Sequence, residues 1–232
     1  MSRESAALNG MSSFIHYLAA HDQAEEQGLP ALKNLSEELG IGIATLREQL
    51  EVARALGFVE VRPRTGIRRR PFSFLPAVRQ SLTYALALDE IHFQAFADLR
   101  QHIEKAYWHE AVRRLTEEDF AELRSLVARA FGKLNGSPIQ LPHSEHRQLH
   151  LLIYQRLNNP FVIGLLEAYW EAYEAIGLNY YTDLNYLMEV WNFHQKMVNA
   201  ICSHDDEAGY TALLEHTDLI HQMLASTSLP EK

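Results

Sequence analysis

The sequence has little cysteine, no leader-like start and no long apolar run. Its 232 residues contain one cysteine, Cys202, which excludes a disulfide framework and a cysteine-rich metal site. The first residues, MSRESAALNG, lack the basic-then-apolar order of a signal peptide. No apolar run approaches the roughly 18 residues needed to cross a bilayer. These absences predict a soluble, cytoplasmic protein with no membrane partner, whose metal ligands must be histidine or carboxylate.

Positive charge is also scarce, since the formal net charge is −9. Affinity for nucleic acid comes mainly from cationic side chains, so this average argues against a nucleic-acid partner. The first 75 residues, however, carry nine Lys or Arg and nine Asp or Glu, whereas the rest carries 12 and 21. Five arginines crowd one early stretch: Arg62, Arg64, Arg68, Arg69 and Arg70. We therefore predict a local basic patch beside an acidic body, and a solvated charge run is the alternative.

The first 72 residues have the pattern of a helix-turn-helix followed by a hairpin. Apolar residues recur at helical spacing in 8–20, 29–39 and 42–56, and the last two segments meet at a Gly-Ile-Gly turn. Residues 58–62 alternate like a strand, and a turn-forming segment that ends at Gly66 precedes a return strand. The pattern predicts a DNA-reading domain with a basic wing.

A helix that enters the major groove needs short or forked polar groups on one face, with cations nearby for phosphate. Thr45 and Arg47 meet the first requirement. The candidate phosphate-binding residues are Lys33, Arg62, Arg64 and the run from Arg68 to Arg70.

From Val78 onward the chain has helical periodicity with short breaks, which predicts a helical bundle. The expected helices are 77–87, 89–114, 117–133, 142–157, 160–177, 183–203 and 206–225. Two prolines in 71–76 mark a boundary. We therefore predict a mainly α protein with a winged helix-turn-helix in 1–72, a linker in 73–78, an antiparallel helical bundle in 79–226 and a tail in 227–232.

Histidine is abundant, with 12 residues, and four of them suggest a site. His146 and His150 are four residues apart, so both rings project from one face of a predicted helix. His194 and His216 lie among apolar residues on two later helices. Imidazoles from three helices can converge on one cation at the centre of a bundle. The spacing leaves open that each is a core histidine with its own local hydrogen bond.

The segment that runs from Leu29-Pro30, through Leu56-Gly57-Phe58, to Gly66 resembles the winged helix-turn-helix of the GntR superfamily of bacterial regulators. The resemblance covers residues 8–70 and implies a homodimer that places Thr45, Arg47 and the wing tip near Gly66 on operator DNA. Gly42-Ile43 stands where the family often has Ser-Arg, so a base-reading arginine is missing. This departure favours an alternative hypothesis, a metal-binding helical scaffold that has lost specific DNA binding.

The order His146-Arg147-Gln148-Leu149-His150, Asn159-Pro160, His194 and His216 resembles the FCD sensor domain of the FadR subfamily, over residues 79–225. The resemblance implies that the four histidines hold a divalent metal beside a small-molecule cavity. His146 stands where the family usually has aspartate, and four neutral imidazoles leave the charge of the ion uncompensated. Zinc or nickel suits nitrogen ligands better than magnesium or calcium, and an anionic ligand is expected to complete the site.

The predicted effector is a small carboxylate, with Arg100 as a second anchor. A structural ion pair between Arg100 and Glu104 is the equal alternative. Five aromatic residues can line the cavity or form plain core: Tyr154, Tyr169, Trp170, Tyr173 and Trp191. A metal-dependent enzyme is a third hypothesis, but no His-Glu-x-x-His motif or glycine-rich phosphate loop is present. We therefore predict a ligand-responsive transcription repressor that is not an enzyme.

Overall fold

The computed structural model describes residues 10–21, 28–62, 66–178 and 183–226, with side chains described as far as Leu219. The chain forms two compact units, Met1–Gln80 and Ser81–Lys232. Residues 227–232, expected to form a tail, lie outside the described residues. No helix among the described residues is long and apolar enough to cross a membrane.

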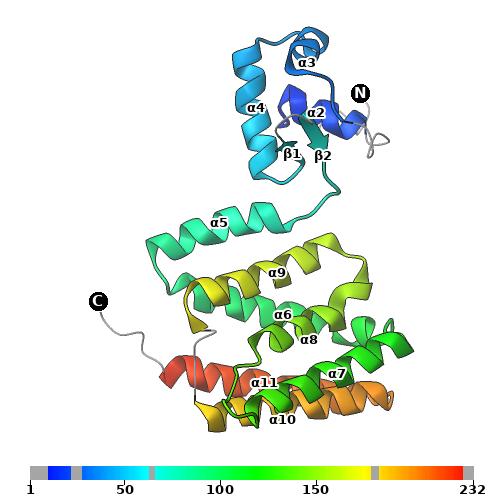
Figure 1. The fold of residues 1–232 in the computed structure, drawn as a ribbon, viewed down its shortest axis with the longest axis vertical. Helices are drawn as coiled ribbons and strands as arrows, with labels where there is room; N and C mark the ends of the chain where they lie inside the picture. Colours follow the sequence, from blue (N-terminus) through cyan, green and yellow to red (C-terminus); the bar gives the residue numbers. More distant parts are fainter. Residues whose placement is uncertain (1–9, 22–27, 63–65, 179–182, 227–232) are drawn as a thin grey trace. The chain divides into compact units, whose positions relative to one another are not determined.

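The first unit is a small helical domain with a two-stranded hairpin (Figure 1). Its elements are α2 (Ser13–Ala20), α3 (Leu32–Leu39), α4 (Ile43–Ala55), β1 (Val59–Arg62) and β2 (Gly66–Arg69). Strand β1 pairs antiparallel with β2, and Val61 lies opposite Ile67. Gly40 ends α3 at a φ of 65°, which only glycine adopts without strain. The winged helix-turn-helix predicted from the sequence is confirmed.

The second unit is an all-helical bundle, as the sequence predicts. Its elements are α5 (Leu75–Leu88), which begins in the first unit, α6 (His92–Val112), α7 (Glu117–Leu134), α8 (His143–Tyr154), the 3-10 helix η1 (Gln155–Leu157), α9 (Pro160–Ala175), α10 (Leu184–Cys202) and α11 (Asp206–Ser226). Helices α7, α10 and α11 pack side by side, while α8 and α9 pack on α6 (Figure 1). The core includes the fully buried Trp108, Leu123, Leu149 and Met197.

The predicted linker at 73–78 differs from the structure, because α5 already begins at Leu75. Pro76 does not prevent this start. Backbone N–H groups in the first turn of a helix have no helical partner, so the N–H that proline lacks is not missed there. The two units divide between Gln80 and Ser81, inside α5 rather than before it. The helix begins two residues before the expected start at residue 77.

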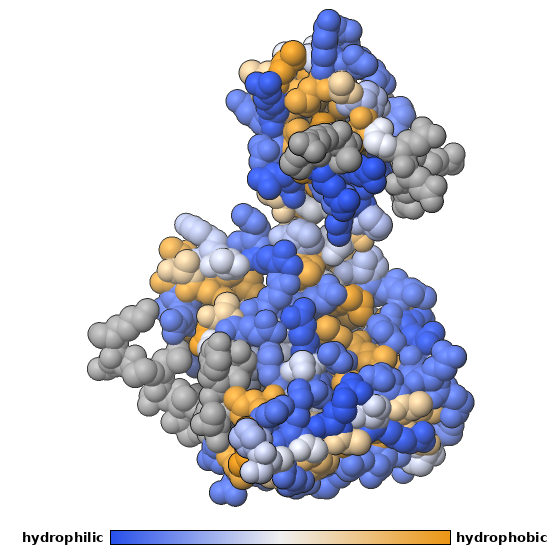
Figure 2. Space-filling model, viewed as in Figure 1, coloured by the Kyte–Doolittle hydropathy of each residue, from blue (hydrophilic) through white to orange (hydrophobic). Residues whose placement is uncertain are grey.

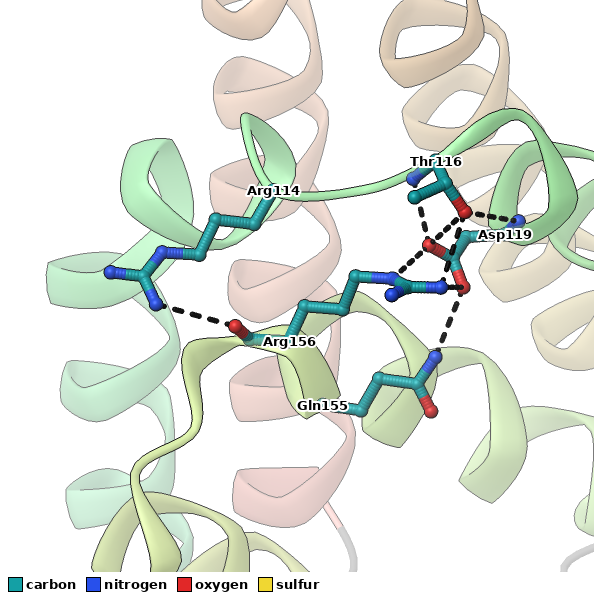
Figure 3. Close-up of polar contacts among 5 residues, drawn as sticks. All are labelled: Arg114, Thr116, Asp119, Gln155 and Arg156. Carbon is teal, nitrogen blue, oxygen red and sulfur yellow. Dashed lines mark hydrogen bonds and ion pairs between the residues drawn. The ribbon is translucent and has the colours of Figure 1, made fainter.

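A polar brace fixes the end of α8, which carries two of the candidate histidines (Figure 3). Thr116 and Asp119 form a capping box at the start of α7, with the Thr116 amide donating to Asp119 Oδ2 at 2.7 Å. The same carboxylate accepts hydrogen bonds from Gln155 Nε2 at 3.1 Å and from the guanidinium of Arg156. Arg114 donates to the Leu157 carbonyl at 3.1 Å. These bonds hold η1 against α7.

A close contact places α11 against α6. The Trp108 indole N–H donates to the Asp206 carbonyl at 3.0 Å. A Cβ atom at Gly209 would lie 2.7 Å from Trp108 Cζ2, so only glycine lets the two helices approach this closely. Arg113 and Asp206 pair at 3.0 Å one turn away. This contact packs α11, which carries His216, against α6.

Candidate metal centre

The four histidines predicted from the sequence meet inside the helical bundle. His146 and His150 come from α8, His194 from α10 and His216 from α11, and one ring nitrogen of each lies within 4.8 Å of the others. His150, His194 and His216 are at most 1% exposed, and His146 is partly buried. The ring centroids of His194 and His216 are 4.4 Å apart. The convergence predicted from the helical spacing is present.

The ring nitrogens lack the partners that core histidines would have. Among the described residues, His146 Nε2, His194 Nδ1 and both nitrogens of His216 are buried without a hydrogen-bond partner. Leaving a buried polar atom unpaired costs about 1–3 kcal/mol, so a core built only for packing would avoid four of them. His150 Nε2 lies 3.1 Å from His194 Nε2, close to the separation of two nitrogens that share a zinc ion at about 2.0–2.1 Å each. The residues fit a nitrogen-bound divalent cation.

Burial keeps these histidines in the form that binds metal. Burial lowers the pKa of His146, His194 and His216 well below the ordinary value, and positive charge on neighbouring histidines and on Arg100 lowers it further. The neutral imidazole is the species with a free lone pair. The cluster is therefore deprotonated and ready to bind a cation at neutral pH.

Glu104 on α6 supplies a carboxylate behind the cluster. Its Oε1 lies 3.0 Å from His150 Nδ1, and both side chains are almost fully buried. When Nε2 of this ring binds a cation, the ring proton lies on Nδ1 and is donated to Glu104, which orients the ligand. In the other neutral tautomer, Nδ1 accepts from Arg100 Nη2 at 2.8 Å. The two tautomers therefore have different partners.

Arg100 is tied to this carboxylate. Its Nε lies 2.9 Å from Glu104 Oε2, with both side chains at most 3% exposed, and its guanidinium carbon lies 4.6 Å from the centre of the Tyr169 ring. Burial raises the pKa of Glu104, but the charges of Arg100 and His150 outweigh burial and hold that pKa below its usual value. Of the two roles that the sequence allows for Arg100, the ion pair with Glu104 is present in the structure.

A small pocket lies next to the cluster, between α8, α9 and α10. Its volume is about 30 Å³, close to the share of one water molecule in the liquid. The lining residues are Leu141, Pro142, His143, His146, Tyr173, Leu178, Tyr186, Leu187, Val190 and Trp191. His143 stacks on Tyr173 with ring centroids 5.5 Å apart, and its Nε2 lies 2.9 Å from Glu174 Oε1. The lining therefore combines His146, one histidine of the cluster, with a mainly apolar wall.

Two residues near the cluster were not identified by sequence reasoning. His143 lines the pocket at the first position of α8, where its distance of three residues from His146 was the available signal. Gln101 is 2% exposed, and neither atom of its amide has a partner among the described residues. An amide buried without partners beside Arg100 is unexplained by packing, and nothing in the sequence pattern distinguishes it from a surface glutamine.

The DNA-reading candidates lie in the first unit. Lys33, Thr45, Arg47 and Arg62 are exposed, Gly66 opens β2 at a φ of 79°, and Arg64 lies outside the described residues. Ile43, which stands where the resemblance expects arginine, is also exposed. Thr45 and Arg47 follow it within the first two turns of α4. Ile43, Thr45 and Arg47 are therefore all exposed near the start of α4.

The arginines of the wing do not share one role. Arg62 pairs with Glu60 at 3.0 Å, and Arg70 lies 3.4 Å from the same carboxylate. Arg69 instead donates to the carbonyls of Leu18 and His21 at the end of α2. A guanidinium at that position satisfies carbonyls that have no helical partner. The basic run thus contains one structural arginine and several exposed ones.

Along the chain, a winged helix-turn-helix is followed by a helical bundle that contains a buried histidine cluster. The FCD domain profile matches residues 95–219, more than half of the chain. The chain therefore belongs to the FCD domain family. This family and the matched relatives are transcriptional regulators, not enzymes.

Two individual comparisons agree with this assignment. The chain is 25% identical over 195 residues to the uncharacterized HTH-type transcriptional regulator YieP of Escherichia coli (strain K12), covering 79% of this chain and 80% of that protein. The solved structure of Streptococcus agalactiae GntR is 18% identical, with a TM-score of 0.68 over 90% of this chain and 96% of that one. The second likeness shows that the two proteins share a fold.

Proposed function

We propose that this regulator is a repressor whose operator affinity is set by a small carboxylate bound at a zinc or nickel ion. The observation that carries the proposal is the buried cluster of His146, His150, His194 and His216, with four nitrogen atoms that have no partner among the described residues. A bound cation would satisfy these atoms. Nitrogen ligands and the absence of a carboxylate from the set favour zinc or nickel over magnesium or calcium.

The charge of such a site supports an anionic effector. Four neutral imidazoles contribute no charge, and the nearby Arg100 and Glu104 neutralise each other. A divalent ion would therefore keep its full charge in a buried site, where an exogenous carboxylate compensates it strongly. Arg100 reaches the cluster through His150 and Glu104. We therefore assign two roles to Arg100. It would hold the metal ligands in place, and it would stabilise the negative charge of the effector carboxylate once the effector binds.

The DNA-facing part of the proposal uses the exposed cations of the first unit. Thr45 and Arg47 would contact bases or phosphate from α4, while Lys33, Arg62 and the wing around Arg64 and Gly66 would contact phosphate. Gly42 and Ile43 provide no forked donor at the positions where the family often has Ser-Arg. We therefore expect the sequence specificity of DNA binding to depend on fewer base contacts than in such family members. We place this activity in the cytoplasm, where operator DNA is found.

We further propose that the active species is a homodimer, because operators with two half-sites match a protein with two-fold symmetry. The second unit exposes apolar side chains that need cover: Tyr84, Leu88 and Ile91 are 58–68% exposed. They follow one another at helical spacing along and just after α5, where Figure 2 shows apolar surface. A second copy of the chain would bury them.

The test is a metal analysis of the purified protein combined with a DNA-binding titration at several salt concentrations. The proposal expects about one zinc or nickel ion per chain and an operator affinity that falls with salt and changes when acetate is added. Metal without DNA binding would favour the scaffold hypothesis that Gly42-Ile43 raised. Protein that binds DNA but holds no metal, even after incubation with zinc, would contradict the sensor mechanism.

A further inference from the structure

We infer that the effector is a monocarboxylate with an apolar body, such as a branched aliphatic or aryl acid, rather than a dicarboxylate. The inference rests on the proposed function, because it assumes that the carboxylate binds at the metal. The pocket beside His146 carries the argument, since it lies between α8, α9 and α10 and has a histidine of the cluster in its lining.

The wall of this pocket is mainly apolar. Apart from His143 and His146, its lining consists of aliphatic side chains, a proline and three aromatic residues whose polar atoms are two tyrosine hydroxyls and one indole N–H: Leu141, Pro142, Tyr173, Leu178, Tyr186, Leu187, Val190 and Trp191. A second carboxylate placed against this wall would lose its hydration without gaining an ion pair. Each apolar methylene buried there would instead tighten binding by about fourfold.

The charged groups around the pocket also disfavour a second carboxylate. The lining contains no lysine or arginine. At the edge of the pocket, Glu174 Oε1 accepts from His143 at 2.9 Å and from Arg147 Nη1 at 3.2 Å. Both of these donors are therefore already bound to the Glu174 carboxylate. Arg100 is buried and paired with Glu104. A second carboxylate on the ligand would meet Glu174 without a free cation to compensate it.

The small volume of the pocket points the same way. About 30 Å³ accommodates one water-sized group, so a larger ligand must displace lining side chains. Leu187 and Tyr186 are partly buried and lie on the wall formed by α10. Apolar side chains can repack around an apolar ligand without leaving a buried polar group unpaired. The wall can therefore adapt to the shape of such a ligand but not to its polarity.

The experiment is calorimetric titration of the full-length, cobalt-loaded protein with acetate, isovalerate, phenylacetate and succinate, while the absorption spectrum of cobalt reports changes at the metal. We expect isovalerate or phenylacetate to bind at least tenfold more tightly than acetate and succinate. Tighter binding of succinate would overturn the inference. Equal binding of acetate and the apolar acids would also overturn it, but would leave the proposed function standing. If no carboxylate, acetate included, changes the spectrum of the bound cobalt, both fail.

A substitution in the wall tests the inference from the protein side. Leu187→Lys places a cation on the pocket wall and should shift the preference between succinate and isovalerate by at least tenfold toward succinate. Leu184→Lys, one turn earlier on α10 and outside the lining, is the matched control and should not shift it. Should Leu187→Lys fail to fold, Leu187→Gln should weaken isovalerate about fourfold while acetate binding is retained. A preference unchanged in the folded variant would contradict the inference.

Discussion

The histidine cluster is a buried candidate site for a cation, whereas the basic wing is an exposed site of positive charge. The cluster is fixed by packing from α8, α10 and α11, and four of its ring nitrogens have no hydrogen-bond partner among the described residues. The exposed wing arginines share Glu60, and Arg69 is used to cap α2. Geometry and protonation therefore govern the cluster, whereas screening by salt governs the wing. Each prediction below tests one side of this difference.

The largest effect is expected from removing a ligand. His194→Ala should lower zinc or nickel affinity more than 100-fold, because the remaining three imidazoles lose the ligand from α10 that closes the site. Metal content after dialysis and calorimetric titration measure this loss. His102→Ala, an exposed histidine on α6, is the control and should keep normal affinity. Retention of metal by the His194 variant would mean that the four rings do not share one ion.

A somewhat smaller effect is expected behind the cluster. Glu104→Gln should weaken metal binding about 10–100-fold, because His150 loses the carboxylate that orients it. It should also destabilise the fold by about 3–5 kcal/mol, because Arg100 is left buried without its counter-ion. Urea denaturation and metal titration measure the two effects. Glu110→Gln, also on α6, is the control and removes an exposed ion pair with Arg114. It should change metal affinity and stability little.

The metal-free protein should lose stability as the pH falls below about 6.5. Since burial lowers the folded-state pKa of His146, His194 and His216, the unfolded chain binds more protons in this window. Their contribution is therefore full above the unfolded pKa and decreases below it. Between pH 7 and pH 6 each ring should contribute about 0.7 kcal/mol, or about 2 kcal/mol together.

Urea denaturation in the presence of EDTA measures this slope. His216→Leu, which removes a ring with two unpartnered nitrogens, should reduce the pH-dependent loss by about a third. His102→Ala should leave it unchanged. A stability that is flat between pH 7 and pH 6 would show that the cluster is open to water and not buried as described.

The smallest effects on stability and binding are expected from substitutions in the wing. They should differ between the adjacent residues Arg68 and Arg69. Arg69→Ala should destabilise the first unit by about 1 kcal/mol, because carbonyls at the end of α2 lose their donor. Arg68→Ala should leave stability unchanged and reduce the salt dependence of DNA binding by about one phosphate contact. Thermal unfolding and binding titrations at several salt concentrations distinguish them. Equal effects of the two substitutions on DNA binding would contradict a structural role for Arg69.

Local sequence patterns predicted the elements well, because they depend on neighbouring residues. The spacing of apolar residues predicted α8 and α10, and Asn159-Pro160 predicted the start of α9, where Asn159 Oδ1 accepts from the Phe161 and Val162 amides. The structure begins α5 at Leu75, two residues before the expected helix, because a proline is tolerated in the first turn of a helix. Two prolines are therefore compatible both with a linker and with the start of a helix.

The sequence by itself determined a winged helix-turn-helix, a helical bundle and four histidines placed on the apolar faces of three helices. Helical periodicity and turn chemistry act over a few residues, so they are readable from the chain. Only the tertiary structure decided that Glu104 stands behind His150, that Arg100 pairs with it, and that Arg69 belongs to α2 instead of the wing surface. These contacts join residues four to 51 positions apart, and most of them depend on how side chains from different elements interlock, which no local pattern encodes.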